Sequence, residues 1–241
     1  MSEKESLKQR LRKGDIIVGM IVPINVNRSQ LDNILSLDTY DFIAVDSQHS
    51  AFNEERLESL CAMAEDIGIP VQFRIKHTRQ AFLIGNLLDL GPLIIEVPFV
   101  EELSTADESV AAFYYPPVGK RSWGGNSLYG LKGNNDRLEY TRWWNSHGIL
   151  CLQIETVGAV TNARQLAKPG VDCFTWGPGD LAFDLEAHPM YPFRNVDDCV
   201  RHVLKQLERT DIRVSFRSGS RSLRNKYIDM GVTVLMERPE P

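Results

Sequence analysis

The chain has 241 residues and a net charge of -5, from 27 Lys and Arg residues against 32 Asp and Glu residues. Hydrophobic residues make up 43% and charged residues 24%, a composition that excludes a disordered chain and suits a globular domain with a sizeable core. Because nucleic acids and anionic membranes favour basic surfaces, this balance argues against both as partners.

The N-terminal segment, residues 1–15, is highly charged and lacks the apolar stretch of a secretory signal. No apolar stretch approaches the roughly 20 residues that a membrane-spanning helix needs. The four cysteines lie far apart without a C-x-x-C pair, which indicates buried thiols in a reducing compartment rather than a zinc site or disulfides. We therefore expect a cytoplasmic protein.

Short apolar runs rich in β-branched residues alternate with segments whose apolar residues recur every three or four positions. The runs predict strands at residues 16–22, 41–47, 70–76, 93–99, 148–155, 172–177, 213–218 and 232–237. The periodic segments predict helices at residues 29–37, 53–68, 79–91, 101–113, 159–167, 195–209 and 220–231. Because most strands are apolar on both faces, we expect an α/β fold, a single (β/α)8 TIM-type barrel over residues 1–241.

Two irregularities interrupt this pattern. Residues 114–147 form a long connection rich in Gly and Pro, with one short helix expected around residues 139–145, and such a connection is usually functional. The sequence continues for four residues after Glu237, which leaves no room for the usual C-terminal eighth helix. We expect an N-terminal helix with Leu7 and Leu11, or a neighbouring subunit, to cover that side.

Charged side chains follow several predicted strands. Asp46 and His49 follow the second strand, Arg74 lies in the third, Glu155 ends the fifth and Asp180 follows the sixth. The carboxyl ends of all strands in a (β/α) barrel meet at one mouth, so these side chains should converge there. That set suits a metal-assisted site for an anionic substrate.

Glu155 and Asp180 are the candidate metal ligands. Their carboxylate oxygens suit Mg²⁺ or Mn²⁺, which accept two protein ligands and complete their coordination with water and substrate oxygens. The alternative is that Glu155 caps a helix and Asp180 makes a turn. The Gly-Pro-Gly before Asp180 favours the functional interpretation, because small residues let backbone N–H groups approach an anion.

His49 is the candidate base, since an imidazole at the mouth can exchange a proton near pH 7, whereas the other four histidines are expected to be solvated or structural. Arg74 interrupts an apolar strand, where a buried cation needs a partner. That partner is either an incoming carboxylate or keto oxygen, or the carboxylate of Asp46 or of another barrel residue in a salt bridge. Glu96 and Arg217 also interrupt strands, and the sequence assigns no role to either.

Taken together and in order, these segments resemble one family, the HpcH/HpaI class of metal-dependent pyruvate aldolases, in the phosphoenolpyruvate/pyruvate-domain superfamily. The resemblance runs over almost the whole chain and rests on LKQRLRKGD, FIAVDSQH, the strand with Arg74, NLLDLG followed by VPFV, YPPVGKRSWGG, LQIET and GPGDL. It implies that Glu155 and Asp180 bind Mg²⁺ or Mn²⁺, which chelates a 2-keto acid, and that Arg74 stabilises the enolate oxygen.

The resemblance also implies the remaining site residues. His49 would act as the base, paired with Asp89 of NLLDLG, which in this family can come from a neighbouring subunit. The backbone N–H groups of Gly179 and Asp180 would hold the substrate carboxylate. A homo-oligomer is expected on the same grounds.

Three functions remain open at this point. The first is a carbon-carbon lyase that acts through a pyruvate-type enolate on a pyruvate- or oxaloacetate-like 2-keto acid and an aldehyde. The second starts from a decarboxylation, as in macrophomate synthase, and is suggested by the SQHS segment at residues 47–50, where Ser47 and Gln48 differ from the family's usual residues. It is also suggested by aromatic residues of the long connection, which could line a pocket for a bulkier acceptor: Trp123, Tyr129, Trp143 and Trp144. The third is a non-catalytic barrel that only binds a ligand.

Overall fold

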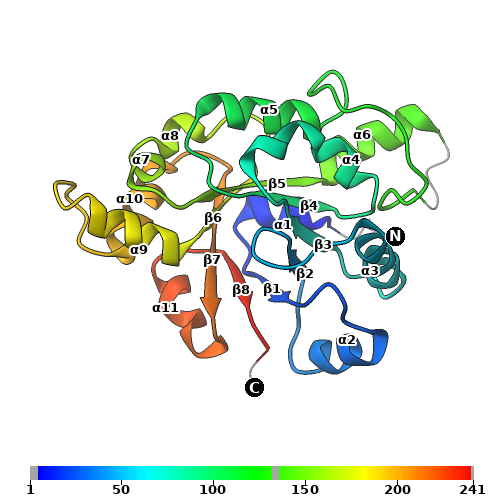
Figure 1. Ribbon diagram of the computed structural model, residues 1–241, viewed down its shortest axis with the longest axis horizontal. Helices are drawn as coiled ribbons and strands as arrows, with labels where there is room; N and C mark the ends of the chain where they lie inside the picture. The colour runs from blue at the N-terminus through cyan, green and yellow to red at the C-terminus, as the bar shows by residue number, and fades with distance from the viewer. Residues whose placement is uncertain (1–4, 132–135, 240–241) are drawn as a thin grey trace.

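Eight parallel strands form a closed barrel in the computed structural model, which describes residues 5–131 and 136–239 (Figure 1). The strands pair in chain order, and β8 pairs back onto β1. They are β1 Ile17–Ile21, β2 Phe42–Asp46, β3 Val71–Arg74, β4 Ile94–Val97, β5 Ile149–Ile154, β6 Cys173–Trp176, β7 Arg213–Gly219 and β8 Val234–Glu237. Each lies within or one residue beyond a predicted run, so the predicted TIM-type barrel is confirmed.

Helices surround the barrel, and several begin at side chains that accept hydrogen bonds from the first turn, as Ser6 and Asn27 do in capping boxes. The α-helices are α1 Leu7–Lys13, α2 Arg28–Leu35, α3 Glu54–Asp66, α4 Ile84–Leu88, α5 Leu103–Phe113, α6 Arg137–His147, α7 Val157–Thr161, α8 Ala163–Leu166, α9 Pro178–Ala187, α10 Val196–Gln206 and α11 Arg224–Asp229. Short 3-10 helices precede two of them: η1 Thr78–Leu83 and η2 Arg221–Leu223.

The helices differ from the predictions in several places. The expected helices at residues 79–91 and 220–231 each begin as a 3-10 helix, η1 or η2, and continue as α4 or α11. The expected helix at residues 159–167 is split into α7 and α8 around Asn162, whose backbone leaves the helical conformation. The short helix in the long connection is longer than expected and forms α6. Helix α9 was not predicted, because only Leu181 in it is buried while Phe183 is 70% exposed, so no apolar stripe marks it.

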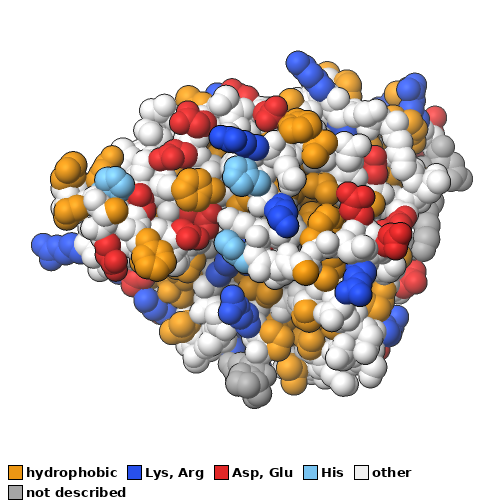
Figure 2. Space-filling view, in the orientation of Figure 1, with side chains coloured by type: hydrophobic (Ala, Val, Ile, Leu, Met, Phe, Trp, Pro, Cys, Tyr) orange, Lys and Arg blue, Asp and Glu red, His pale blue; other side chains and the backbone are white. Residues whose placement is uncertain are grey.

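The surface carries mixed charges. Figure 2 shows Lys and Arg side chains interspersed with Asp and Glu over one face of the molecule, as the overall composition suggested. Among residues 5–131 and 136–239, no helix is both long and apolar enough to cross a bilayer. The expectation of buried thiols is confirmed, since all four cysteines are buried and free.

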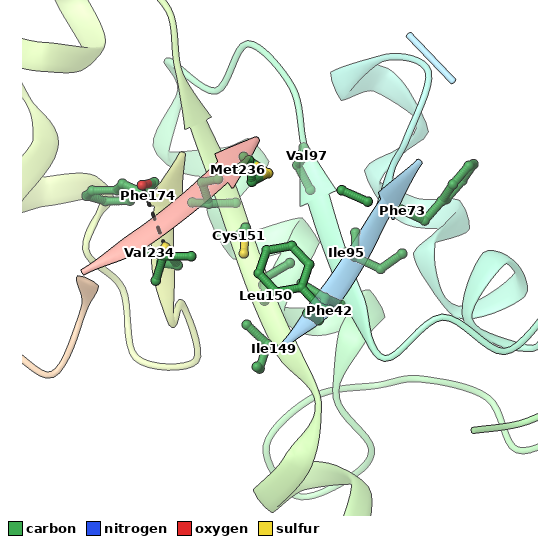
Figure 3. Close-up of a cluster of buried hydrophobic side chains, with 14 of the residues drawn as sticks. Phe42, Phe73, Ile95, Val97, Ile149, Leu150, Cys151, Phe174, Val234 and Met236 are labelled. Atoms are coloured by element: carbon green, nitrogen blue, oxygen red, sulfur yellow. Dashed lines mark hydrogen bonds between the residues drawn. The ribbon is translucent and has the colours of Figure 1, made fainter. Parts of the chain in front are cut away.

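The amino-terminal half of the barrel interior is lined mainly by apolar side chains. Figure 3 shows side chains from several strands gathered into one buried cluster, with the Phe42 ring of β2 beside Cys151 of β5. Gly19 of β1 makes room for that ring, because a Cβ at this position would overlap it. Toward the carboxyl ends of the strands the interior becomes polar, with buried Gln72, Glu96 and Gln153.

Helix α1 closes the amino-terminal end of the barrel. Leu7 and Leu11 line a small internal space together with residues at the starts of the strands, among them Ile17 and Phe42. The sequence allowed this helix to cover the side beside β8. It lies instead against the starts of the strands. Beside β8, buried Glu237 of that strand is held by Arg224 of α11, with a distance of 2.7 Å between the Arg Nε and the Glu Oε1.

Candidate active site

A pocket of about 360 Å³ opens at the carboxyl ends of the strands. Five of the predicted site residues line it: His49, Arg74, Glu155, Gly179 and Asp180. They come from the ends of four different strands, far apart in the sequence. The convergence expected from barrel geometry is therefore present.

Glu155 follows β5 and is 1% exposed. Its Oε2 accepts a hydrogen bond of 3.0 Å from the backbone N–H of Phe99, whereas Oε1 is buried without a partner among the described residues. Burial raises the pKa of Glu155 to about 7, helped by the nearby Asp180 and Glu96 carboxylates and opposed by Arg74. A buried carboxylate oxygen without a donor, next to a second carboxylate, is the environment that a cation would stabilise.

Phe99 owes its donor position to an unusual backbone. Its φ is 50°, a left-handed conformation that non-glycine residues rarely adopt. This conformation turns the Phe99 N–H toward Glu155 in the loop after β4. No pattern in the sequence predicts this contact, because a main-chain donor has no residue-type signature.

The Gly-Pro-Gly segment shapes the other side of the pocket. A Cβ at Gly177 would overlap Oε1 of Glu155, so glycine is required for the Glu155 side chain to take its position. Pro178 then begins α9, and Asp180 is exposed in its first turn. The N–H groups of Gly179 and Asp180 thus belong to the first turn of a helix, where they have no intrahelical acceptor and favour an anion.

The alternative interpretations of the two carboxylates fail. Thr156, not Glu155, caps α7, because its side chain accepts from the N–H of Ala159. Asp180 lies in a helix rather than in a turn.

Two carboxylates with an unpartnered oxygen fit a hard divalent ion that keeps open positions for water and substrate. No group of three or more His, Cys, Asp or Glu residues suited to a metal occurs in the described part of the chain.

Arg74 is held by Asp46 in the wall of the pocket. Its Nε and Nη2 donate to the two carboxylate oxygens of Asp46 at 2.8 and 2.6 Å, and Nη1 donates to Gln153 at 3.2 Å. Burial of Asp46 favours protonation, but Arg74 outweighs it and lowers the Asp46 pKa. The salt bridge between Arg74 and Asp46 is confirmed. It holds the Arg74 guanidinium in the pocket wall, where the group still faces the pocket.

Glu96 and Arg217, which had no assigned role, form a pair inside the barrel. Glu96 is fully buried and accepts from Arg217 at 2.7 Å, Gln72 at 2.6 Å and Thr175 at 2.8 Å. Burial alone would raise the Glu96 pKa, but Arg217 and Arg74 lower it. The Nε of Arg217 is buried without an acceptor among the described residues, and the side chain lines the pocket.

His49 and Asp89 are not brought together within one chain. His49 is exposed at the pocket and has no hydrogen-bond or ion-pair partner in the described residues. Asp89 follows α4, outside the pocket, and accepts from Nη2 of Arg121 at 2.9 Å. The pairing of His49 with Asp89 of a neighbouring subunit therefore stays a prediction.

The aromatic residues of the long connection pack among themselves. Tyr129 stacks on Trp143 with ring centroids 6.3 Å apart, Trp123 meets Tyr140 at 5.5 Å, and Trp144 is fully buried. None of them lines the pocket described above. The expectation of an aromatic-lined acceptor pocket is wrong for the pocket of this chain, because Tyr129, Trp143 and Trp144 pack against the hydrophobic core and Trp123 is 41% exposed outside the pocket.

Comparisons with known proteins identify the family of this chain. The sequence profile of the HpcH/HpaI aldolase/citrate lyase family matches residues 21–217. A 2-keto-3-deoxy-L-rhamnonate aldolase from Escherichia coli is 28% identical over 181 residues, which span 74% of this chain and 66%, just under two thirds, of that protein. A hydroxypyruvate/pyruvate aldolase from Chromohalobacter salexigens is 33% identical over 184 residues, or 71% of this chain and 67% of the relative.

A solved structure gives the same result for the fold. The crystal structure of an HpcH/HpaI aldolase from Desulfitobacterium hafniense superposes with a TM-score of 0.85 at 26% identity, covering 98% of this chain and 91% of the other. The profile match over most of the sequence and this similarity of fold show that the chain belongs to the HpcH/HpaI aldolase/citrate lyase family.

Proposed function

We propose that this protein is a metal-dependent aldolase that breaks or forms the carbon-carbon bond between a 2-keto acid, such as pyruvate or an oxaloacetate-like acid, and an aldehyde. The observation that carries the proposal is the buried, unpartnered Oε1 of Glu155, which lies beside Asp180 and faces the Arg74 guanidinium across one pocket. Two relatives of this chain are named as aldolases, which supports this reaction type.

Glu155 and Asp180 would hold Mg²⁺ or Mn²⁺, which when bound supplies a Lewis acid that polarises the keto group. The N–H groups of Gly179 and Asp180 bind the substrate carboxylate at the start of α9. Arg74, fixed by Asp46, stabilises the negative charge that develops on the keto oxygen. These contacts orient a 4-hydroxy-2-keto acid so that the bond between C3 and C4 breaks, which leaves the pyruvate-type enolate and the aldehyde.

His49 would move the proton of the aldol hydroxyl. It is exposed at the pocket and free of partners among the described residues, so it can approach a substrate hydroxyl and needs an orienting group. Asp89 of a second copy would supply that group, which makes a homo-oligomer part of the proposal. We also place the protein in the cytoplasm, because four free, buried thiols suit a reducing compartment.

Exchange of the pyruvate methyl protons with deuterium tests the proposal without knowledge of the aldehyde. NMR should show exchange with enzyme and Mn²⁺ or Mg²⁺, and EDTA should abolish it. Absence of exchange, or exchange that EDTA does not affect, would contradict the proposal.

Neither alternative is favoured by a structural observation. One of the two grounds for the decarboxylation route was the set of aromatic residues in the long connection, and these residues do not line the pocket. Carbon dioxide release from oxaloacetate without any aldol cleavage would restore it. A barrel that only binds ligands predicts no exchange even when calorimetry detects Mn²⁺ binding.

A further inference from the structure

Arg217 enters the same pocket as Arg74, but from the opposite side of the barrel. Arg74 belongs to β3 and Arg217 to β7, two strands that lie four positions apart in the closed barrel of eight. Both side chains line the pocket that also contains Glu155 and Asp180. The proposed function gives Arg74 a role and leaves Arg217 without one. A keto acid bound in this pocket therefore meets cations from two sides.

The Arg217 side chain is held across the barrel interior. Its Nη2 donates to Glu96 of β4 at 2.7 Å, although β4 and β7 are not neighbouring strands. Glu96 is fully buried and also accepts from Gln72 and Thr175, so its own position is fixed. Glu96 is the in-register neighbour of Arg74 on β4. The Arg217 guanidinium is therefore fixed at about the same level of the barrel as the base of the Arg74 side chain.

The two arginines differ in how many of their donors are used. Arg74 donates Nε and Nη2 to Asp46 and Nη1 to Gln153. Arg217 donates Nη2 to Glu96 and keeps a buried Nε–H that no described residue accepts. A buried N–H group without an acceptor is costly, and an anionic oxygen in the pocket would satisfy it.

Stability alone is a poor explanation for the pair of Glu96 and Arg217. Burying two charges costs much of what their attraction returns, and a well-packed apolar pair is often as stable. A pair that leaves an N–H group without an acceptor is less favourable still. The pair does, however, place a guanidinium in the pocket without adding net charge to the barrel interior. That arrangement suits a donor that is kept for a ligand.

We propose that Arg217 is a further catalytic residue, whose Nε–H donates a hydrogen bond to an oxygen of the bound 2-keto acid, and that Glu96 is the residue that positions it. This inference rests on the proposed aldolase function and adds a residue to it. The negative charge of the enolate then lies between Arg74 and Arg217. Because a hydrogen bond to a growing negative charge becomes stronger, the contribution of Arg217 falls mainly on kcat.

Replacement of both members of the pair separates a catalytic role from a structural one. Glu96→Gln combined with Arg217→Met removes both charges together, so no unpaired charge stays buried and the fold should persist. In deuterium exchange of the pyruvate methyl protons with Mn²⁺, kcat should fall about tenfold or more, with a smaller change in KM. Exchange at the wild-type rate would show that the pair serves only the fold.

A single substitution repeats the test with the charge kept. Arg217→Lys retains a cation for Glu96 but lacks the guanidinium Nε–H, so we expect a similar fall in exchange. Arg213→Lys is the matched control at the other end of β7, where Nη1 of Arg213 donates to the backbone oxygen of Thr210 outside the pocket. This control should keep wild-type exchange. Wild-type exchange in Arg217→Lys would contradict the contact between Nε–H and the keto acid.

Oxalate binding supplies a measurement that needs no turnover. Oxalate is a planar dianion that resembles the enolate of pyruvate, so it should gain from the same donors as the reacting species. Calorimetry in the presence of Mn²⁺ should show oxalate affinity reduced about tenfold in the paired variant, with Mn²⁺ affinity itself unchanged. Unchanged oxalate affinity would contradict the proposed contact.

The wild-type enzyme separates the two levels of the proposal. If it exchanges the methyl protons and the Arg217 variants exchange them equally fast, the role of Arg217 is wrong and the aldolase function stands. If the wild type itself shows no exchange, the proposed function fails and this inference fails with it.

Discussion

The two ends of the barrel both contain buried charges, but those charges are satisfied to different extents. At the amino-terminal end, Lys8 donates to Tyr114 and Gly148 and pairs with Asp172 at 3.0 Å, and Asp172 also accepts from Leu150. At the mouth, by contrast, Glu155 has a buried oxygen to which no described residue donates a hydrogen bond.

Arg217 and Gln153, also at the mouth, each have a buried N–H group without an acceptor among the described residues. The charges at the amino-terminal end form a closed network that stabilises the fold, whereas Glu155 and Arg217 at the mouth each keep an unpartnered atom that a ligand could satisfy. Residue type alone does not distinguish the two ends, because both use carboxylates and cations. The difference predicts that substitutions at the mouth reduce activity and that substitutions at the closed end reduce stability.

Glu155→Gln should have the largest effect on activity. Without this carboxylate the site loses one of two charged ligands, so we expect metal-dependent deuterium exchange to fall about 1,000-fold. Isothermal calorimetry should show weakened Mn²⁺ binding in the same variant. Glu208→Gln, which changes an exposed glutamate far from the mouth, serves as the control and should behave as wild type. Full exchange activity in Glu155→Gln would contradict the role of Glu155 as a metal ligand.

Lys8→Met should have the largest effect on stability. Removing this ammonium leaves Asp172 buried with less compensation, which costs about 3 kcal/mol in the free energy of unfolding. Urea unfolding measures that loss, and kcat per folded molecule should not change. Lys13→Met in the same helix is the control, because Lys13 is exposed and should affect stability little. Equal stabilities of the two variants would contradict the structural role of the Lys8 network.

Much of the fold was predictable because strand signals are local. Runs such as residues 148–155 combine β-branched and apolar residues, and the polar residue at each strand end then falls at the mouth by topology alone. The family and the barrel predicted from these segments are confirmed. The positions of Glu155 and Asp180 at one pocket followed from the same reasoning.

The remaining features depend on contacts that the sequence does not encode locally. Glu96 and Arg217 are 121 residues apart and pair across the barrel, so neither residue alone indicates the other. Helix α9 buries only Leu181, so no apolar stripe in the sequence predicts it. Asp89 contacts Arg121 in this chain, and its expected pairing with His49 involves a second copy, which no local pattern can reveal.

Arg74→Lys should have a smaller effect than loss of Glu155. Lysine keeps the charge but cannot make the bidentate hydrogen bonds to Asp46, so the cation loses its fixed position. We expect kcat for aldol cleavage to fall about 100-fold with a smaller change in KM. Arg201→Lys, at an exposed arginine of α10, controls for the substitution itself. An unchanged kcat would show that the Asp46 contact does not position Arg74 for the reaction.

The pH dependence of stability gives the smallest and most specific effect. In the metal-free protein the pKa of Glu155 is raised from about 4.5 to about 7, chiefly by burial. The folded state therefore binds this proton more tightly than the unfolded state, so wild-type stability falls as pH rises from about 4.5 to about 7. Glu155→Gln lacks that loss and should become more stable than wild type by on the order of 2 kcal/mol above pH 7 in EDTA.

Addition of Mn²⁺ separates this effect from a general gain in stability. The metal binds the folded wild type and should restore its stability above pH 7, since binding to the native state alone favours folding. Glu155→Gln should gain much less from the same Mn²⁺ concentration. A wild-type protein whose metal-free stability does not fall between pH 4.5 and 7 would mean that the Glu155 oxygen is already satisfied, and the contrast between the two barrel ends would then lose its main support.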